Sequence, residues 1–108
     1  MEQVNSSNFD DYINQDCVTI VDFFATWCMP CKMYKPILER VSSEVKDVKF
    51  ATLDIDESED IAKRYRVFSV PTLVCFKSGK KIDSIVGLNP YDEVVAFANR
   101  CKNTNIDE

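Results

Sequence analysis

The sequence has no histidine and only two glycines among its 108 residues. A structural zinc site usually takes four cysteine or histidine ligands, arranged as two spaced pairs. The chain offers one closely spaced cysteine pair and no second one, so no bound metal is expected. With so little glycine it also lacks the G-x-G-x-x-G turn that cradles dinucleotides, and it should bind neither NADPH nor flavin itself.

Long apolar runs and an excess of positive charge are also missing. No apolar run reaches the length that a membrane span needs, and the net charge is −5. With a pI near 4.7, the chain is not expected to bind nucleic acid or an anionic membrane. Residues 1–6 have neither the basic region nor the apolar core of a secretory signal. These absences predict a cytoplasmic protein.

Size and composition predict a single globular domain, residues 1–108, with 45% hydrophobic residues. Five cysteines are an odd number, and without a secretory signal we expect them to be reduced thiols of the cytosol. Cys75 lies inside an apolar run and is interpreted as a core residue. Cys17 opens a strand. Cys101 lies near the end of the last helix, where exposure and a regulatory or dimerising role are the alternatives to burial.

The most informative segment is W-C-M-P-C, residues 27–31. It follows an apolar run, residues 17–25, that predicts a buried strand, and it precedes a helical pattern. A helix N-terminus presents unpaired N–H groups and the positive end of the helix dipole. A thiolate is stabilised there, and thiol pKa values at such sites fall to roughly 3.5–7.5 from about 8.5. The thiolate is the form of cysteine that attacks disulfides.

The Cys28–Cys31 pair has three interpretations. As a structural cross-link it would close a very short ring, which restrains the unfolded chain little. As half of a zinc site it lacks the second pair of ligands. A redox pair, whose bond opens and closes, is the interpretation that its position favours.

Asp22 is the one charged residue in the apolar run before the pair. A buried carboxylate is costly, and its pKa rises so that it tends to keep a proton. A bulge that places it in water, or a polar neighbour, would be a purely structural explanation. Because Asp22 precedes the pair on the same strand and turn, it is also a candidate proton acceptor for the cysteines.

The order of elements predicts an α/β fold. Strand patterns lie at Val4 and at residues 17–25, 48–55, 72–76 and 81–86. Helical patterns lie between these strands and after them, and Asn89 is expected to cap the last helix with Pro90 at its first position. The turn Ser78-Gly79 joins the last two strands as an antiparallel hairpin. The expected architecture is a central mixed sheet, part parallel with this C-terminal hairpin, flanked by helices on both faces.

At this level of detail the chain resembles the thioredoxin family over nearly all of its length. A lone C-x-x-C is a moderate signal. The same pair inside W-C-x-P-C-K, with an aspartate upstream and Val-Pro-Thr further along the chain, is a very specific one. The matching segments are Val21–Cys28, Pro30–Met33, Pro36, Asp54–Asp56, Val70–Leu73, Phe76-Lys77-x-Gly79 and Gly87.

The resemblance implies a role for each matching residue. Cys28 would be the exposed attacking thiolate, Cys31 the resolving thiol, and Asp22 the buried acid–base group that serves Cys31 through water. Pro71 would be a cis proline that holds the backbone of Val70 outward, where a substrate strand can pair with it. From the residues alone, Pro71 could be an ordinary strand-start proline and Gly87 a strand-end turn. The implied substrate-binding residues are Trp27, Met29, Pro30, Val70, Pro71 and Gly87.

Two departures from the family pattern matter. Met29 stands where most thioredoxins have glycine, which adds bulk beside Cys28 and leaves the redox potential open. Many bacterial members carry a lysine near the buried aspartate, and the matching position here is Thr52. Without that charged partner, the carboxyl of Asp22 should be harder to ionise.

The resemblance implies a protein-disulfide reductase that works by dithiol–disulfide exchange. Its redox-active disulfide, Cys28–Cys31, would be reset with electrons from NADPH through a thioredoxin reductase. Other expected partners are disulfide-containing proteins, with peroxiredoxins as one candidate class, and the chain is expected to be a monomer. The alternatives are an oxidase or isomerase of the protein disulfide isomerase type, and a thioredoxin-like binding module without turnover.

Overall fold

The computed structural model describes residues 1–104, so the last four residues of the predicted 1–108 domain lie outside the described part. Its strands are β1 (Glu2–Val4), β2 (Val18–Phe24), β3 (Val48–Asp54), β4 (Thr72–Lys77) and β5 (Lys80–Val86). Its helices are α1 (Phe9–Ile13), α2 (Met29–Glu44), α3 (Glu59–Arg64) and α4 (Tyr91–Lys102). The predicted order of strands and helices is confirmed, with bounds that differ by one or two residues.

The five strands form one mixed sheet in the order β1-β3-β2-β4-β5. β1, β3 and β2 are parallel, while β4 runs antiparallel to β2 and β5 antiparallel to β4. β2 is therefore the central strand, and six of its seven residues are buried. The prediction of a parallel part with an antiparallel C-terminal hairpin is confirmed.

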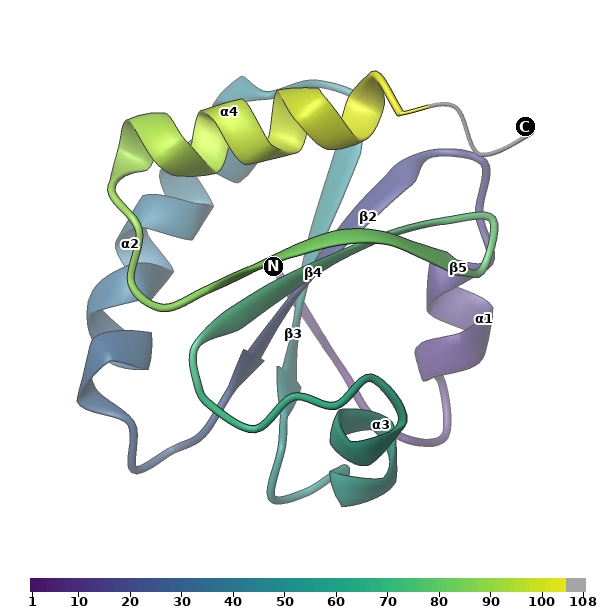
Figure 1. Ribbon diagram of the computed structural model, residues 1–108, viewed down its shortest axis with the longest axis vertical. Helices are drawn as coiled ribbons and strands as arrows, with labels where there is room; N and C mark the ends of the chain where they lie inside the picture. The colour runs from purple at the N-terminus through teal and green to yellow at the C-terminus, as the bar shows by residue number, and fades with distance from the viewer. Residues whose placement is uncertain (105–108) are drawn as a thin grey trace.

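Helices cover both faces of this sheet, as Figure 1 shows. On one face, α2 and α4 pack over a core that includes Ile20, Leu73 and Cys75. On the other face, α1 and α3 pack over a core that includes Val21, Phe23 and Phe76. Alternate residues of β2 thus enter opposite cores, which explains why its sequence is apolar without a break.

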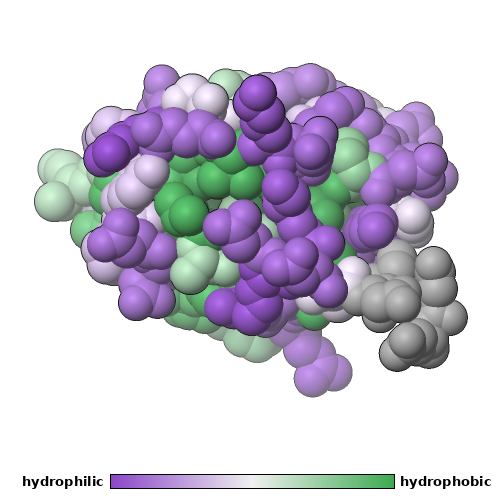
Figure 2. All heavy atoms as spheres, turned by 90° about the horizontal axis from the view of Figure 1, so that it is seen from above, coloured by the Kyte–Doolittle hydropathy of each residue, from purple (hydrophilic) through white to green (hydrophobic). Residues whose placement is uncertain are grey.

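Hydrophilic residues cover most of the surface on the side where α4 lies. Figure 2 shows this side, with hydrophobic residues visible in the gaps between the hydrophilic ones. No helix within residues 1–104 combines the length and the apolar character of a membrane span.

Two local predictions near α4 are corrected. The helix begins at Tyr91 with Pro90 as its N-cap residue, and no side chain caps it. Asn89 does not cap the helix because its amide donates to the carbonyl oxygens of Val86 and Gly87 instead, at 3.4 and 3.0 Å. Cys101 is fully buried rather than exposed, because it continues the inward stripe of α4 and packs in the same core as Cys75.

Candidate active site

The cysteine pair lies where the chain leaves β2 and enters α2. Cys28 is the N-cap residue of α2, and its sulfur accepts a hydrogen bond from the backbone N–H of Cys31 at 3.2 Å. Pro30 occupies the first turn, where a missing N–H removes no helical hydrogen bond. The two cysteines form a disulfide, with their Cα atoms 5.3 Å apart. The predicted position of the pair at a helix N-terminus is confirmed.

Both cysteines of the pair are buried, although the resemblance implied an exposed Cys28. Cys28 is 4% exposed and Cys31 5% exposed, so an exposed Cys28 is wrong for this disulfide form. The reason is local packing, because the pair forms a small apolar cluster with Ala25, Phe24, Ile55 and Val70. A substrate disulfide therefore has to approach through this cluster or displace part of it.

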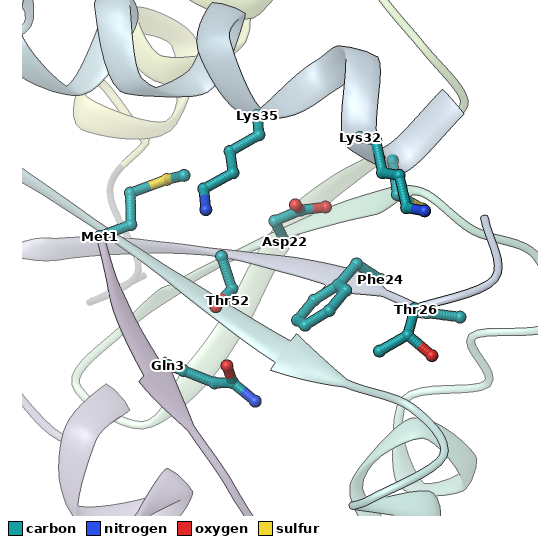
Figure 3. Close-up of a pocket in the computed structure, with 10 residues that line it drawn as sticks. Met1, Gln3, Asp22, Phe24, Thr26, Lys32, Lys35 and Thr52 are labelled. Carbon is teal, nitrogen blue, oxygen red and sulfur yellow. The ribbon is translucent and has the colours of Figure 1, made fainter. Parts of the chain in front are cut away.

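Asp22 lies beneath the pair in the middle of the sheet. It is buried, and its Oδ1 atom has no hydrogen-bond partner within the described residues. A cavity of about 510 Å³ is lined by both Asp22 and Cys31, and Figure 3 shows the Asp22 carboxyl at this cavity. A cavity of this size, with polar groups such as Asp22 and Thr52 in its walls, has room for ordered water. Asp22 and Cys31, which the sequence analysis linked by proton transfer, thus line one cavity.

Burial raises the pKa of Asp22 from 3.8 to about 7. The cause is desolvation, since an ionised carboxylate in an apolar surrounding loses its hydration. A carboxyl with a pKa near 7 exchanges its proton at neutral pH, which is the property that a general acid–base group needs. The direction agrees with the expectation that Asp22 is hard to ionise, and its cause is burial.

Thr52 is the register partner of Asp22 on β3, so the position expected to hold a lysine lies beside the carboxyl and is uncharged. A lysine of α2, Lys35, lines the same cavity. Figure 3 shows Lys35 extending from α2 with its ammonium group directed into the space beside Asp22 and Thr52. Sequence reasoning missed Lys35 because its proximity to Asp22 depends on how α2 packs over the sheet.

The predicted cis proline is confirmed, because the Val70–Pro71 peptide bond is cis. Val70 packs against the cysteine cluster, and within residues 1–104 neither its N–H nor its carbonyl oxygen has a hydrogen-bond partner. The carbonyl oxygen of Pro71 accepts a bond from Gly87 N–H at 2.8 Å, which joins this segment to the end of β5. Val70 therefore offers a free donor and acceptor beside the disulfide.

Gly87 has a positive φ of 92°, so glycine is favoured there by backbone conformation. The space where a Cβ atom would lie is open, with no atom within 4 Å. A turn at the end of β5 and a place in the implied substrate-binding surface are therefore compatible for Gly87.

Trp27 and Met29 flank Cys28 on the surface. Trp27 is 69% exposed, and its indole N–H donates to Asp56 Oδ2 at 2.9 Å. Sequence reasoning gave Asp56 no role at the site. Its place in the matching segment Asp54–Asp56 was the available signal for a role at the site. Met29 is exposed, so its side chain adds apolar surface beside the disulfide.

Within residues 1–104, no group of three potential ligands gathers to hold a metal ion.

Comparison with known proteins supports this geometry. The family model described as Thioredoxin matches residues 1–100. Thioredoxin-1 of Saccharomyces cerevisiae is 46% identical over 85 residues, which are 79% of this chain and 82% of that protein. The X-ray structure of Fasciola hepatica thioredoxin superposes with a TM-score of 0.87 at 33% identity, covering 94% of this chain and all of that one.

A further similar structure concerns the thiol-resolving mechanism of a yeast mitochondrial 1-Cys peroxiredoxin via glutathione and thioredoxin systems. Its TM-score is 0.82 at 37% identity, and the match covers 92% of this chain and 94% of that one.

Proposed function

The chain belongs to the thioredoxin family and is a dithiol–disulfide oxidoreductase that reduces protein disulfides, and on that premise we propose how its residues divide the work. Cys28 is the nucleophile, Cys31 the resolving thiol and Asp22 the proton acceptor. The observation that carries this assignment is the shared cavity of Asp22 and Cys31 beneath a cysteine at a helix N-cap.

In the first step, the Cys28 thiolate attacks one sulfur of a substrate disulfide. A new S–S bond joins Cys28 to the substrate, the substrate bond breaks, and the departing sulfur leaves as a thiolate that takes a proton from water. The N–H of Cys31 points at the Cys28 sulfur, and it stabilises the thiolate before attack. The surface that binds the substrate is formed by Trp27, Met29, Pro30, Val70, Pro71 and Gly87.

In the second step, Cys31 loses its thiol proton to the Asp22 carboxylate through water in the common cavity. The resulting thiolate attacks the Cys28 sulfur, the Cys28–Cys31 bond forms, and the mixed disulfide breaks. The second substrate sulfur leaves as a thiolate and is protonated. The substrate has then gained two electrons and two protons, and the protein is in its disulfide form.

A separate thioredoxin reductase restores the dithiol with electrons from NADPH, so the chain acts as an electron carrier without a bound cofactor. Peroxiredoxins are one class of substrate. The similar yeast structure supports this, because it concerns the thiol-resolving mechanism of a mitochondrial 1-Cys peroxiredoxin via glutathione and thioredoxin systems. The chain works as a monomer in the cytoplasm.

The cytoplasmic location is supported by the three further cysteines, Cys17, Cys75 and Cys101. They are free thiols, and a reducing compartment preserves thiols.

Insulin reduction tests this function directly. Wild-type protein with NADPH and a thioredoxin reductase should reduce insulin, and Cys28→Ser should not. Cys31→Ser should instead form long-lived mixed disulfides through Cys28, because the resolving thiol is missing. Wild-type protein that stays inert with both the reductase and dithiothreitol would contradict the proposal. A strongly oxidising potential in a glutathione titration would favour the oxidase alternative.

Gel filtration and the localisation of a fluorescent fusion test the remaining points. A dimer would contradict the monomer, and mitochondrial fluorescence would contradict the cytoplasmic location.

A further inference from the structure

A second hollow lies beside the substrate-binding segment Val70-Pro71, between residues 65–69 and strand β5. Its volume is about 210 Å³, and its walls include Arg66, Phe68, Thr72 and Lys81. β5 is the outer strand of the sheet, with β4 as its single neighbour (Figure 1). We call this hollow the β5 groove. None of its lining residues takes part in the two chemical steps described above.

Two exposed apolar side chains border the β5 groove. Phe68 is 87% exposed, and Val86 on β5 is 63% exposed. Phe68 does not sit on a loose loop, because the backbone N–H groups of Arg66 and Val67 donate to carbonyl oxygens of the α3 turn at 3.1 and 2.9 Å. An aromatic ring held in water by an anchored loop leaves apolar surface that a partner can cover.

The charge of the β5 groove is opposite to that of the protein as a whole. Arg66 and Lys81 contribute two positive charges, and no lining residue is acidic, although the chain carries a net charge of −5. Neither residue forms an ion pair within residues 1–104. The acid on β5, Asp83, bonds Arg100 of α4 at 2.9 Å and so has its charge matched elsewhere. The groove therefore presents two cations that form no ion pair with an acid of residues 1–104.

The β5 groove borders the proposed substrate-binding surface, because its lining residue Ser69 directly precedes Val70. Phe68 lies two residues before Val70, whose free backbone groups face the substrate in the proposed function. Val86 is the register partner of Thr72 and directly precedes Gly87. A polypeptide that pairs with Val70 would extend on one side across this groove.

We propose that the β5 groove selects substrates, and that it binds the segment flanking the substrate cysteine when this segment carries an acidic residue and an apolar one. The carboxylate pairs with Arg66 and Lys81, and the apolar side chain covers Phe68 and Val86. This proposal rests on the proposed function and adds a specificity that the cysteine pair alone does not have. Exposed ion pairs are weak, at most about fivefold each in an equilibrium constant, so the groove biases the choice of substrate without excluding others.

Single-turnover kinetics with defined peptides test the proposal. Each peptide carries one cysteine as a mixed disulfide with thionitrobenzoate, and Cys28 attack on the peptide sulfur releases the coloured thionitrobenzoate anion. The flanking residues are Glu-Leu, Gln-Leu or Lys-Leu on either side of the cysteine. Wild-type reduced protein should react about tenfold faster with the Glu peptide than with the Lys peptide at low salt. The difference should shrink at 0.5 M salt, where the screening length falls to about 4 Å.

Variants assign the effect to the β5 groove. Lys81→Glu combined with Arg66→Glu should abolish or invert the preference. Lys46→Glu, a charge reversal in the exposed turn between α2 and β3, should leave it unchanged. Phe68→Ala should slow all Leu-containing peptides by about fivefold, the scale of losing one apolar contact at an interface. The rate with neutral hydroxyethyl disulfide should be the same in every variant, because that reagent is too small to reach the groove.

Equal Glu-to-Lys ratios in wild type and in the double variant would overturn the proposal. So would a Phe68→Ala variant that reacts with peptides as fast as wild type. Insulin reduction by the wild type separates these failures from a failure of the proposed function, since insulin would still be reduced if only the groove assignment were wrong.

Discussion

Replacing Asp22 with asparagine should make the protein more stable at neutral and alkaline pH. Burial raises the pKa of this carboxyl to about 7, against 3.8 for the ordinary group. Below pH 4 the carboxyl is protonated in both the folded and the unfolded state. Between pH 4 and 7 the unfolded chain releases its proton while the folded protein keeps it, so the free energy of unfolding falls as the pH rises through this window.

The size of the effect follows from the two pKa values. Each pKa unit corresponds to about 1.4 kcal/mol, so the full penalty above pH 8 is about 4 kcal/mol. Between pH 5 and pH 8 the wild type should lose about 3 kcal/mol that Asp22→Asn does not lose. Asparagine keeps the volume of the side chain and removes its ionisation, so the comparison isolates the charge.

Urea unfolding of the disulfide form at pH 5, 6, 7 and 8 measures this difference. The quantity to compare is the free energy of unfolding of the variant minus that of the wild type at each pH, because titration of other groups then cancels. Asp16→Asn, the same substitution at an exposed position, is the matched control against which the pH dependence of Asp22→Asn is judged. A pH-independent difference for Asp22→Asn would refute the assignment of a burial-raised pKa to this carboxyl.

Three further predictions concern residues around the site. Lys35→Met should raise the midpoint of the Asp22 titration, because an ammonium group in the same cavity favours the ionised carboxylate. Infrared absorption of the carboxyl measures this midpoint. An unchanged midpoint would mean that the charge of Lys35 is screened from Asp22. Asp56→Ala should lower kcat/KM for insulin about two- to fivefold, since the Trp27 indole loses its hydrogen bond. The rate with hydroxyethyl disulfide should stay unchanged. Loss of both rates together would argue against a role of Trp27 in substrate docking. Cys101→Ser should lower the free energy of unfolding by about 1–3 kcal/mol, because a hydroxyl replaces sulfur in an apolar core, and urea unfolding of Cys101→Ala alongside it would separate polarity from lost volume.

The order of elements was predictable because it depends on local patterns. The apolar run of β2, the turn at Ser78-Gly79 and the helical stripe after Pro30 each depend on residues close in sequence. The cysteine pair was predictable for the same reason, since its position between a strand and a helix is a local property. Asp22 could be found because a carboxylate in an otherwise apolar strand is rare enough to need an explanation.

Features that depend on distant segments were not predictable in this way. The burial of Cys28 depends on Val70 and Ile55, which arrive from two other strand ends. The Trp27–Asp56 bond depends on the parallel pairing of β2 with β3, and the position of Lys35 depends on the packing of α2 over the sheet. Cys101 is a different case, because its spacing from Val94, Phe97 and Ala98 was a local signal for the buried face of α4 that the sequence analysis did not use.

The pairing of β2 with β4 has a consequence for how this member of the family can change over time. Phe23 opposes Thr72, so the end of β2 and the beginning of β4 lie at the same margin of the sheet. The irregularity in the β4–β5 ladder falls at Cys75–Phe76, away from that margin. Backbone hydrogen bonds of the sheet, and not loop side chains, therefore set the distance between the cysteine turn and the proline segment. Residues 65–69 can accordingly be exchanged to suit new partners while the sulfur chemistry stays the same, which lets recognition diversify independently of reactivity.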